Sequence, residues 1–210
     1  HNKEEIERNK LTHAVASNNG NTALGYPVYV DRNHDGVLDN QDMTYLGNAD
    51  PVVYGGFQNN FRIGKFNLGV YFVYSLGGKI FNYSELYMAG SRSTNQYAYM
   101  VNAWHPVKNP DSNLPRAGII DGDVHSTRML HDASYLRLKT VSLSYMWNVK
   151  KKFIRDITFS ISGENLYLWK HYNGFDPDVS TSSDGSTLRR MDLGAYPRAR
   201  TIMASIQLRY

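Results

Sequence analysis

Five segments of this chain alternate between apolar and polar side chains, and this period of two restricts the fold more than any other feature. In residues 54–63, the side chains of Phe57, Phe61 and Ile63 fall on one face and polar side chains on the other. Residues 66–78 continue the same alternation. Because successive side chains of a β-strand point to opposite faces, the pattern predicts strands with one apolar and one polar face.

The five predicted strands are joined by connections of two very different lengths. The other three strands are expected at residues 134–147, 157–169 and 200–210. The links at 64–65 and 148–156 are short, and the glycine in the first predicts a hairpin. The links at 79–133 and 170–199 are long, and the first of these exceeds the loop lengths of compact domains.

Short turns on one side, long loops on the other and a repeat of two are typical of an outer-membrane β-barrel. Strands of about 9–11 residues also cross a bilayer when tilted. The alternative is a soluble β-sandwich, whose strands alternate too. The one-sided loop lengths favour the barrel, as do Arg62 and Arg209, which lie opposite the apolar rows.

Five strands are too few to close a membrane barrel, because the smallest have about eight. An open edge in lipid would leave backbone groups unpaired, at several kcal/mol each. The chain is therefore expected to assemble as an oligomer or to form the end of a larger barrel, of which the second is simpler. The predicted fold class is all-β, with about five C-terminal antiparallel strands of a large transmembrane β-barrel and long extracellular loops.

The stretch "DRNHDGVLDNQD", residues 31–42, matches the D-x-[DN]-x-[DN]-G template of calcium-binding loops. Gly36 would permit the sharp turn, and Asp42 stands where the template prefers a bidentate glutamate. The predicted ligands are Asp31, Asn33, Asp35, the carbonyl of Val37, Asp39 and Asp42. A structural Ca²⁺ is expected here; the alternative is an Asp/Asn-rich turn that holds no metal.

Composition narrows the function classes. The net charge of +4 is too small and too scattered to indicate nucleic-acid binding. The absence of cysteine excludes disulfides and thiolate chemistry. No catalytic motif is recognisable, so no catalytic residue is predicted and an enzyme is not expected. The 13% of aromatic residues suggests an exposed β protein, a carbohydrate binder or a protein at a membrane–water boundary.

Aromatic residues in the long loops are candidates for contact with a substrate or a partner, because flat rings bind sugar faces and apolar surfaces. The alternative is packing within the loops, together with the aromatic girdle of a barrel at the lipid headgroups. The candidates are Tyr83, Tyr87, Tyr97, Tyr99, Trp104, Trp169 and Tyr172.

Several phrases together resemble the C-terminal part of the SusC/RagA family of TonB-linked outer-membrane transporters of Bacteroidetes-type bacteria. They are "YVDRNHDGVLDNQDMTYLGNADPVVYGGFQNNF", "NLGVYFVYSLGGKIFN", "ASYLRLKTVSLSY", "ISGENLYLWKHYNGFDPDVS" and "GAYPRARTI". Their order and spacing follow the family pattern from Gly25 to the C-terminus. The departures are Thr140 for Asn, Asp178 for Glu and Ala199 for Pro, and none falls on a predicted metal ligand.

The resemblance implies the last five strands of a plugged barrel of about 22 strands, with the plug and TonB box upstream of this chain. Such a transporter imports oligosaccharides or peptides across the outer membrane, driven through TonB and assisted by a SusD-like surface lipoprotein. Residues 1–53, with the loops 79–133 and 170–199, would be extracellular, and residues 54–210 would supply the barrel strands. Tyr210 resembles the aromatic end that the barrel-assembly machinery reads.

One rival interpretation stays open at this point. A secreted, calcium-stabilised β-domain that binds glycans, like an adhesin or lectin module, would also show alternating strands, a calcium loop and many exposed aromatic residues. Such a domain would need no contact with outer-membrane lipid. A calcium-dependent surface hydrolase is disfavoured by the missing catalytic group.

Overall fold

A computed structural model describes residues 12–13, 24–27, 29–90, 95–118, 126–151, 153–181 and 189–210. The chain divides into two compact units, one of residues 1–46 and 82–130 and the other of residues 47–81 and 131–210. The strands are β1 (Thr12–His13), β2 (Val37–Leu38), β3 (Val53–Ile63), β4 (Phe66–Leu76), β5 (Lys79–Asn82), β6 (Leu130–Asp132), β7 (Tyr135–Lys151), β8 (Ile154–Lys170), β9 (Met191–Asp192) and β10 (Thr201–Arg209). The helices are α2 (Tyr83–Gly90) and the 3-10 helices Asn40–Asp42, Ala98–Asn102 and Thr127–Met129.

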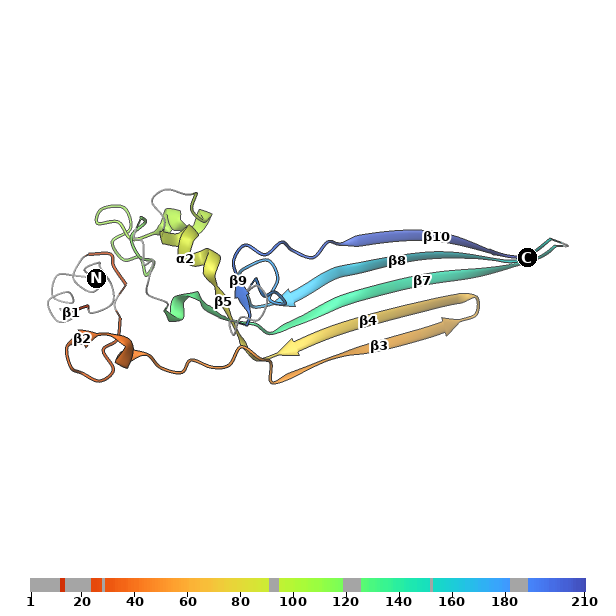
Figure 1. Ribbon diagram of the computed structural model, residues 1–210. Coiled ribbons are helices and arrows are strands. Elements are labelled where there is room, and N and C mark those ends of the chain that lie inside the picture. Colours follow the sequence, from red (N-terminus) through yellow and green to blue (C-terminus); the bar gives the residue numbers. More distant parts are fainter. Residues whose placement is uncertain are drawn as a thin grey trace. The chain divides into compact units, whose positions relative to one another are not determined.

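Five long strands of the second unit form one antiparallel sheet in the order β10-β8-β7-β4-β3 (Figure 1). The five predicted strands and the hairpin turn at 64–65 are confirmed. The predicted link at 148–156 was wrong, because β7 runs on to Lys151 and β8 begins at Ile154. Backbone pairing continues there without an apolar face, since ladder hydrogen bonds do not depend on side-chain character.

The register of the sheet lines up the apolar side chains of all five strands in rows. One row is Phe61, Leu68, Leu143, Ile161 and Ala204, and the next is Ile63, Phe66, Tyr145, Phe159 and Ile206. Many of these side chains are exposed, with Phe61 and Ile161 each at 51%. A continuous apolar face of this size is stable where it meets lipid or another apolar surface.

The opposite face of the same sheet is polar. A row of Arg62, Asn67, Ser144, Ser160 and Ser205 crosses it, beside a second row of Asn60, Gly69, Ser142, Ser162 and Met203. Small and polar side chains on one face and large apolar ones on the other are the two surfaces of a membrane-barrel wall. The alternation predicted from the sequence is confirmed.

An irregularity near one end of the sheet changes which residues face which side. In β4, Tyr71 pairs with Thr140 and the next residue, Phe72, pairs with Leu138, so β7 has Lys139 as an extra residue. Such a bulge reverses the alternation of the strand beyond it. Leu138 therefore shares the apolar face with Phe72, while Arg137 lies on the polar face.

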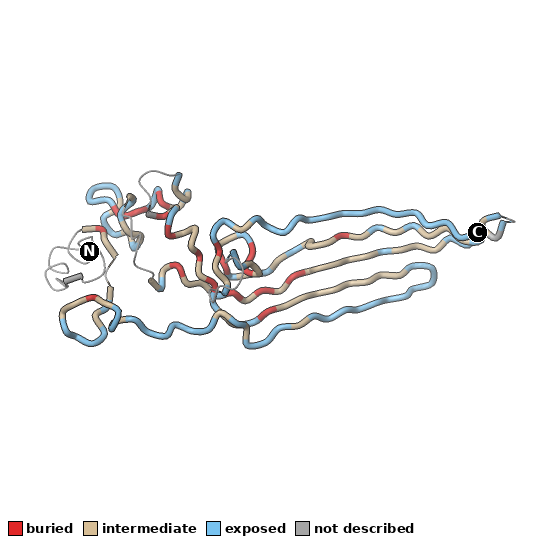
Figure 2. The backbone as a smooth tube through the Cα atoms, in the orientation of Figure 1, coloured by how far each residue is buried: buried red, intermediate tan, exposed pale blue. Residues whose placement is uncertain are grey.

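The long loops contain short regular elements that the alternation did not predict. Strands β6, β5 and β9 form a second sheet, and α2 with two of the 3-10 helices lies between β5 and β6. Ile80, Ala133 and Tyr172 form a small buried core, against which Val179 packs. Gly78, at φ +80°, turns the chain into β5, and a Cβ there would lie 2.7 Å from a backbone carbonyl oxygen. Figure 2 shows buried residues of the second unit gathered near these short strands.

The first unit has its own small core. Ala89, Met100 and Ala103 are buried together, with Tyr97 and Tyr99 packed against them. Strand β1 pairs in parallel with β2. None of the helices in the described ranges is long and apolar enough to cross a membrane.

Candidate functional site

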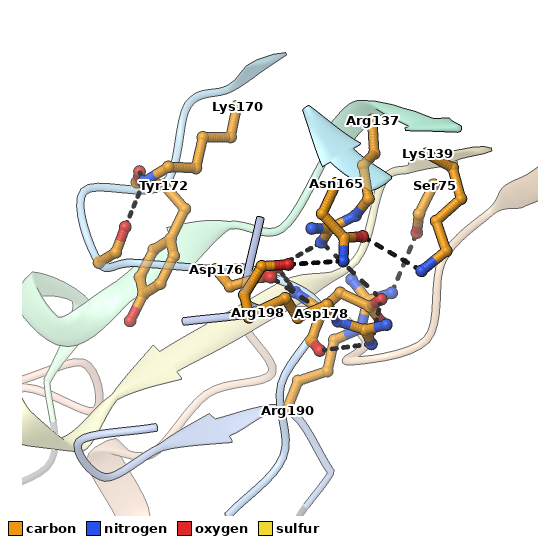
Figure 3. Close-up of polar contacts among 12 residues, drawn as sticks. Ser75, Arg137, Lys139, Asn165, Lys170, Tyr172, Asp176, Asp178, Arg190 and Arg198 are labelled. Atoms are coloured by element: carbon orange, nitrogen blue, oxygen red, sulfur yellow. Dashed lines mark hydrogen bonds and ion pairs between the residues drawn. The ribbon is translucent and has the colours of Figure 1, made fainter. Parts of the chain in front are cut away.

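Two arginines and two aspartates form an ion-pair cluster on the polar face of the sheet (Figure 3). Arg137 of β7 donates from Nη2 to Oδ1 of Asp176 at 2.7 Å. Arg198, just before β10, donates from Nη2 to Oδ2 of Asp178 at 2.7 Å. Each arginine also approaches the other aspartate, at 4.0 Å for Arg137 and 3.8 Å for Arg198. These ion pairs hold the loop between β8 and β10, called the last loop from here on, against β7. We call these four residues the Arg–Asp cluster.

The central pair of this cluster is buried. Arg137 is 4% exposed and Asp176 is 3% exposed. A buried charge is costly unless it is paired and hydrogen-bonded, and this pair meets both conditions. Pro177, between the two aspartates, is also fully buried. The arrangement fixes backbone position; it offers two carboxylates already neutralised by arginine rather than an acid and a base free to react.

Neighbouring contacts extend the same anchorage. The Lys139 ammonium donates to Oδ1 of Asn165 at 3.1 Å, and Asn165 donates to the carbonyl of Ala199 at 3.0 Å. Arg190 donates from Nη2 to Ser75 Oγ at 3.0 Å. The last loop is therefore attached to β4, β7 and β8.

Asp176 and Asp178 had no place among the site residues predicted from the sequence, and their ion pairs were missed. The two aspartates also form a turn, because the Asp178 N–H donates to Asp176 Oδ1 at 3.0 Å. The partner Arg137 could not be assigned to the polar face, since the bulge at Lys139 reverses the alternation. The available signal was an arginine within an apolar strand, which must find a partner when it is buried.

The predicted calcium loop has the turn that the template requires. Asp31 accepts hydrogen bonds from the backbone N–H groups of His34 at 2.7 Å and Gly36 at 2.9 Å. Asp35 accepts from the N–H of Val37 at 2.8 Å. Gly36 has φ +82°, the conformation for which glycine is favoured. The first half of the loop is thus closed by its own side chains.

The second half of the loop is a capped 3-10 helix. Asp39 accepts from the N–H of Gln41 at 2.7 Å, and Asp42 accepts from the N–H groups of Arg32 at 2.7 Å and Asp39 at 3.0 Å. Hydrogen bonds from Asp39 and Arg32 hold the pKa of Asp42 below its usual value. In the described part of the chain, no group of three or more His, Cys, Asp or Glu side chains is arranged to hold a metal ion. The carboxylates satisfy backbone N–H groups rather than converge on one point.

Four of the five candidate aromatic residues of the first unit occur in two pairs. Tyr83 and Tyr87 meet edge to face at 5.3 Å between ring centroids, and Tyr97 stacks on Tyr99 at 5.5 Å. The Tyr99 hydroxyl donates to Glu85 Oε1 at 3.0 Å. Burial is the main cause that raises the pKa of Tyr99, and the nearby charge of Glu85 raises it further. The hydroxyl therefore stays protonated and remains a hydrogen-bond donor. Of these four rings, Tyr87 is exposed.

The other three candidate rings have structural surroundings. Trp104 is 7% exposed and Tyr172 is 2% exposed, so their rings are not available to a ligand in this structure. Tyr172 instead donates to Asp192 at 2.7 Å. Trp169 lies at the end of β8 near Phe72 and Tyr167, on the apolar face, which favours the girdle alternative. Tyr210 follows β10 directly and is 99% exposed.

An antiparallel sheet with an uncovered apolar face, a polar second face and long loops at one end defines a segment of membrane-barrel wall. No family model matches the chain. The chain is 30% identical to TonB-dependent receptor P3 of Formosa agariphila over 205 residues, which are 93% of this chain and 20% of that receptor. It is 23% identical to TonB-dependent receptor SusC of Bacteroides thetaiotaomicron over 87% of this chain and 17% of SusC.

A solved structure has a similar fold. The structure of the RagAB peptide transporter matches with a TM-score of 0.69 at 23% identity, over 82% of this chain and 19% of that chain. The chain is thus a SusC/RagA-like sequence that corresponds to the C-terminal portion of such a barrel, and its location is the bacterial outer membrane. It spans about a fifth of the length of the curated relatives it matches. These relatives are receptors, and none is named as an enzyme.

Proposed function

We propose that this chain supplies the last barrel strands and adjoining loops of a TonB-dependent outer-membrane importer. The apolar face that crosses all five long strands carries the proposal, because it is exposed in this structure and fits lipid. The similarity to TonB-dependent receptors over 93% of the chain supports it. The chain performs no covalent chemistry in this proposal; it forms part of a gated path.

The cargo is a glycan or a peptide, and the partners are TonB and a SusD-like surface lipoprotein. The resemblance to the SusC/RagA family implies either cargo, and the likeness to the RagAB peptide transporter supports a peptide. The segment of residues 1–53 and the loops 79–133 and 170–199 lie on the extracellular side, where Tyr87 is exposed for contact with lipoprotein or cargo. Tyr210 serves as the aromatic end read during barrel assembly.

A chimaeric receptor tests the proposal. The matched segment of TonB-dependent receptor P3 is replaced by this chain, and the product is examined for outer-membrane location and for a barrel that resists SDS until heated. Uptake of labelled oligosaccharides and peptides is then measured with and without functional TonB. We expect a heat-modifiable barrel and TonB-dependent uptake. A chain that stays soluble and monodisperse without detergent would contradict the proposal and favour the adhesin-like alternative.

We further propose that residues 31–42 bind a structural Ca²⁺. The spacing of Asp31, Asn33 and Asp35 before the turn at Gly36 supports it. Each carboxylate oxygen has a second lone pair, so the bonds to backbone N–H groups leave acceptor capacity for a cation. Titration of the purified chimaera with Ca²⁺, with Asp31→Ala/Asp35→Ala as control, should show one additional binding event in the unsubstituted protein.

A further inference from the structure

The last loop, in its described ranges 171–181 and 189–200, folds back over the polar face of the sheet. Ser75 of β4 and Arg137 of β7 belong to this face, and both are buried, at 3% and 4% exposure. The loop therefore covers one end of the polar face, whereas Asn60 and Arg62 of the edge strand β3 stay exposed toward the other end.

Arg137 is the contact that this arrangement depends on most. It is the one residue of the Arg–Asp cluster that belongs to a strand of the sheet, whereas Asp176, Asp178 and Arg198 all belong to the loop. Its guanidinium reaches both aspartates, at 2.7 Å and 4.0 Å. Without Arg137, the buried Asp176 carboxylate would lose its 2.7 Å hydrogen bond and keep only the more distant Arg198, at 3.8 Å, as an ion-pair partner. Breaking a buried ion pair is strongly destabilising, so the loop segment that carries Asp176 would leave the sheet to become solvated.

Exposed contacts cannot replace this anchor. Arg189 of the loop also forms an ion pair with Asp50, which lies just before β3, at 3.2 Å between Nη1 and Oδ1. The two side chains are 71% and 53% exposed. Exposed pairs of this kind contribute little. Arg137 and Arg189 can therefore be compared directly, because both hold the last loop, Arg137 through a buried ion pair and Arg189 through an exposed one.

We infer that Arg137 is the positioning residue that fixes the last loop against the polar face of the sheet, and that this loop is a stationary part of the channel wall. The second half of the inference rests on the proposed function, in which the polar face lines the channel. The loop then narrows the outer end of the channel on the side formed by β4, β7 and β8, and cargo passes beside it.

This chain contains no cysteine, so one thiol introduced into it can report the position of the loop once any cysteine in the rest of the chimaera is replaced. Val179→Cys places it where Val179 packs against Ile80, Ala133 and Tyr172. The labelling rate with a polyethylene-glycol maleimide is measured on the assembled chimaeric receptor in outer membranes. The labelling rate is compared among four versions of the Val179→Cys receptor. One has no further substitution, two carry Arg137→Gln or Arg137→Lys, and the control carries Arg189→Gln. The ion conductance of each purified receptor, with its plug deleted so that the lumen is open, is measured in planar bilayers.

We expect Arg137→Gln to raise the labelling rate about tenfold or more and to increase conductance. Arg137→Lys retains the charge and should stay within about twofold of the unsubstituted receptor, as should Arg189→Gln. Unchanged labelling in Arg137→Gln would overturn the inference, and so would failure of Arg137→Lys to restore protection. Unchanged conductance with faster labelling would overturn the channel-wall role.

A second variant tests the inference if the Arg137→Gln receptor does not assemble. Asp176→Asn keeps an oxygen to accept from the Asp178 N–H but removes the charge that faces Arg137. Should Arg137→Gln not assemble, faster labelling in Asp176→Asn supports the inference and unchanged labelling refutes it. The proposed function fails separately, when the unsubstituted chimaera forms no heat-modifiable barrel.

Discussion

Placing an arginine at Ile161 should destabilise the assembled barrel by about 2–4 kcal/mol. Ile161 lies in the apolar row between Leu143 and Ala204 and is 51% exposed, so its side chain faces lipid in the proposed barrel. An arginine there brings a guanidinium into hydrocarbon with no partner. The same substitution at the adjacent Ser160 would project from the polar face at almost the same depth.

The depth of Ile161 follows from the length of the apolar stretch of β8. From Ile157 to Tyr167 the strand has about 11 residues, or about 37 Å at about 3.4 Å each. A tilt of about 45° projects this length onto about 26 Å, which matches the apolar band of about 25 Å around such barrels. Ile161 then lies about 10 Å inside one rim, near the midplane, and Ile157 lies at that rim, where an arginine costs about 0–1 kcal/mol.

The assay is the urea concentration at which the chimaeric receptor, in lipid vesicles, loses its heat-modifiable band. We expect the order Ile161→Arg, then Ile157→Arg, then Ser160→Arg, from the most to the least destabilised. Equal losses for Ile161→Arg and Ser160→Arg would refute the assignment of the two faces. A larger loss of stability for Ile157→Arg than for Ile161→Arg would refute the placement of Ile161 near the midplane of the membrane.

Three further outcomes are expected outside the lipid-facing rows. Chelation of Ca²⁺ should increase protease cleavage within residues 25–50, and unchanged digestion would count against the metal site. Gly78→Ala should cost about 1–3 kcal/mol, more than Gly64→Ala, because only the former meets a backbone oxygen, and thermal unfolding of both variants would show it. Burial alone would raise the pKa of Asp132, but hydrogen bonds from Ser134 outweigh it and lower that pKa. Its stabilisation is thus full above about pH 4 and lost on further acidification, a loss that Ser134→Ala should reduce in pH-dependent unfolding.

The strands of the main sheet could be predicted because each carries its own evidence. Phe57, Phe61 and Ile63 reveal a face by spacing alone, and the same holds for each of the other four strands. Their pairing order also follows the chain closely, since the hairpins β3–β4 and β7–β8 need no long-range information. Lipid-facing residues are thus encoded locally.

The Arg–Asp cluster could not be predicted, because its members are far apart in the sequence and depend on a backbone irregularity. Arg137 and Asp176 are 39 residues apart, and no local pattern links them. Simple alternation from Val141 back through the strand assigns Arg137 to the apolar face, where a charge would not be tolerated. The burial of Trp104 and Tyr172 likewise depends on tertiary packing, and a count of loop aromatics cannot distinguish a buried ring from an exposed one.

The extra residue in β7 constrains how this strand can change in length. An insertion or deletion of one residue between Arg137 and Val141 would exchange the two faces of the outer part of the strand, and the guanidinium would point into the membrane. A change of two residues would keep both faces and shift only the height of the last loop. Length variation among related chains at this point should therefore occur in steps of two.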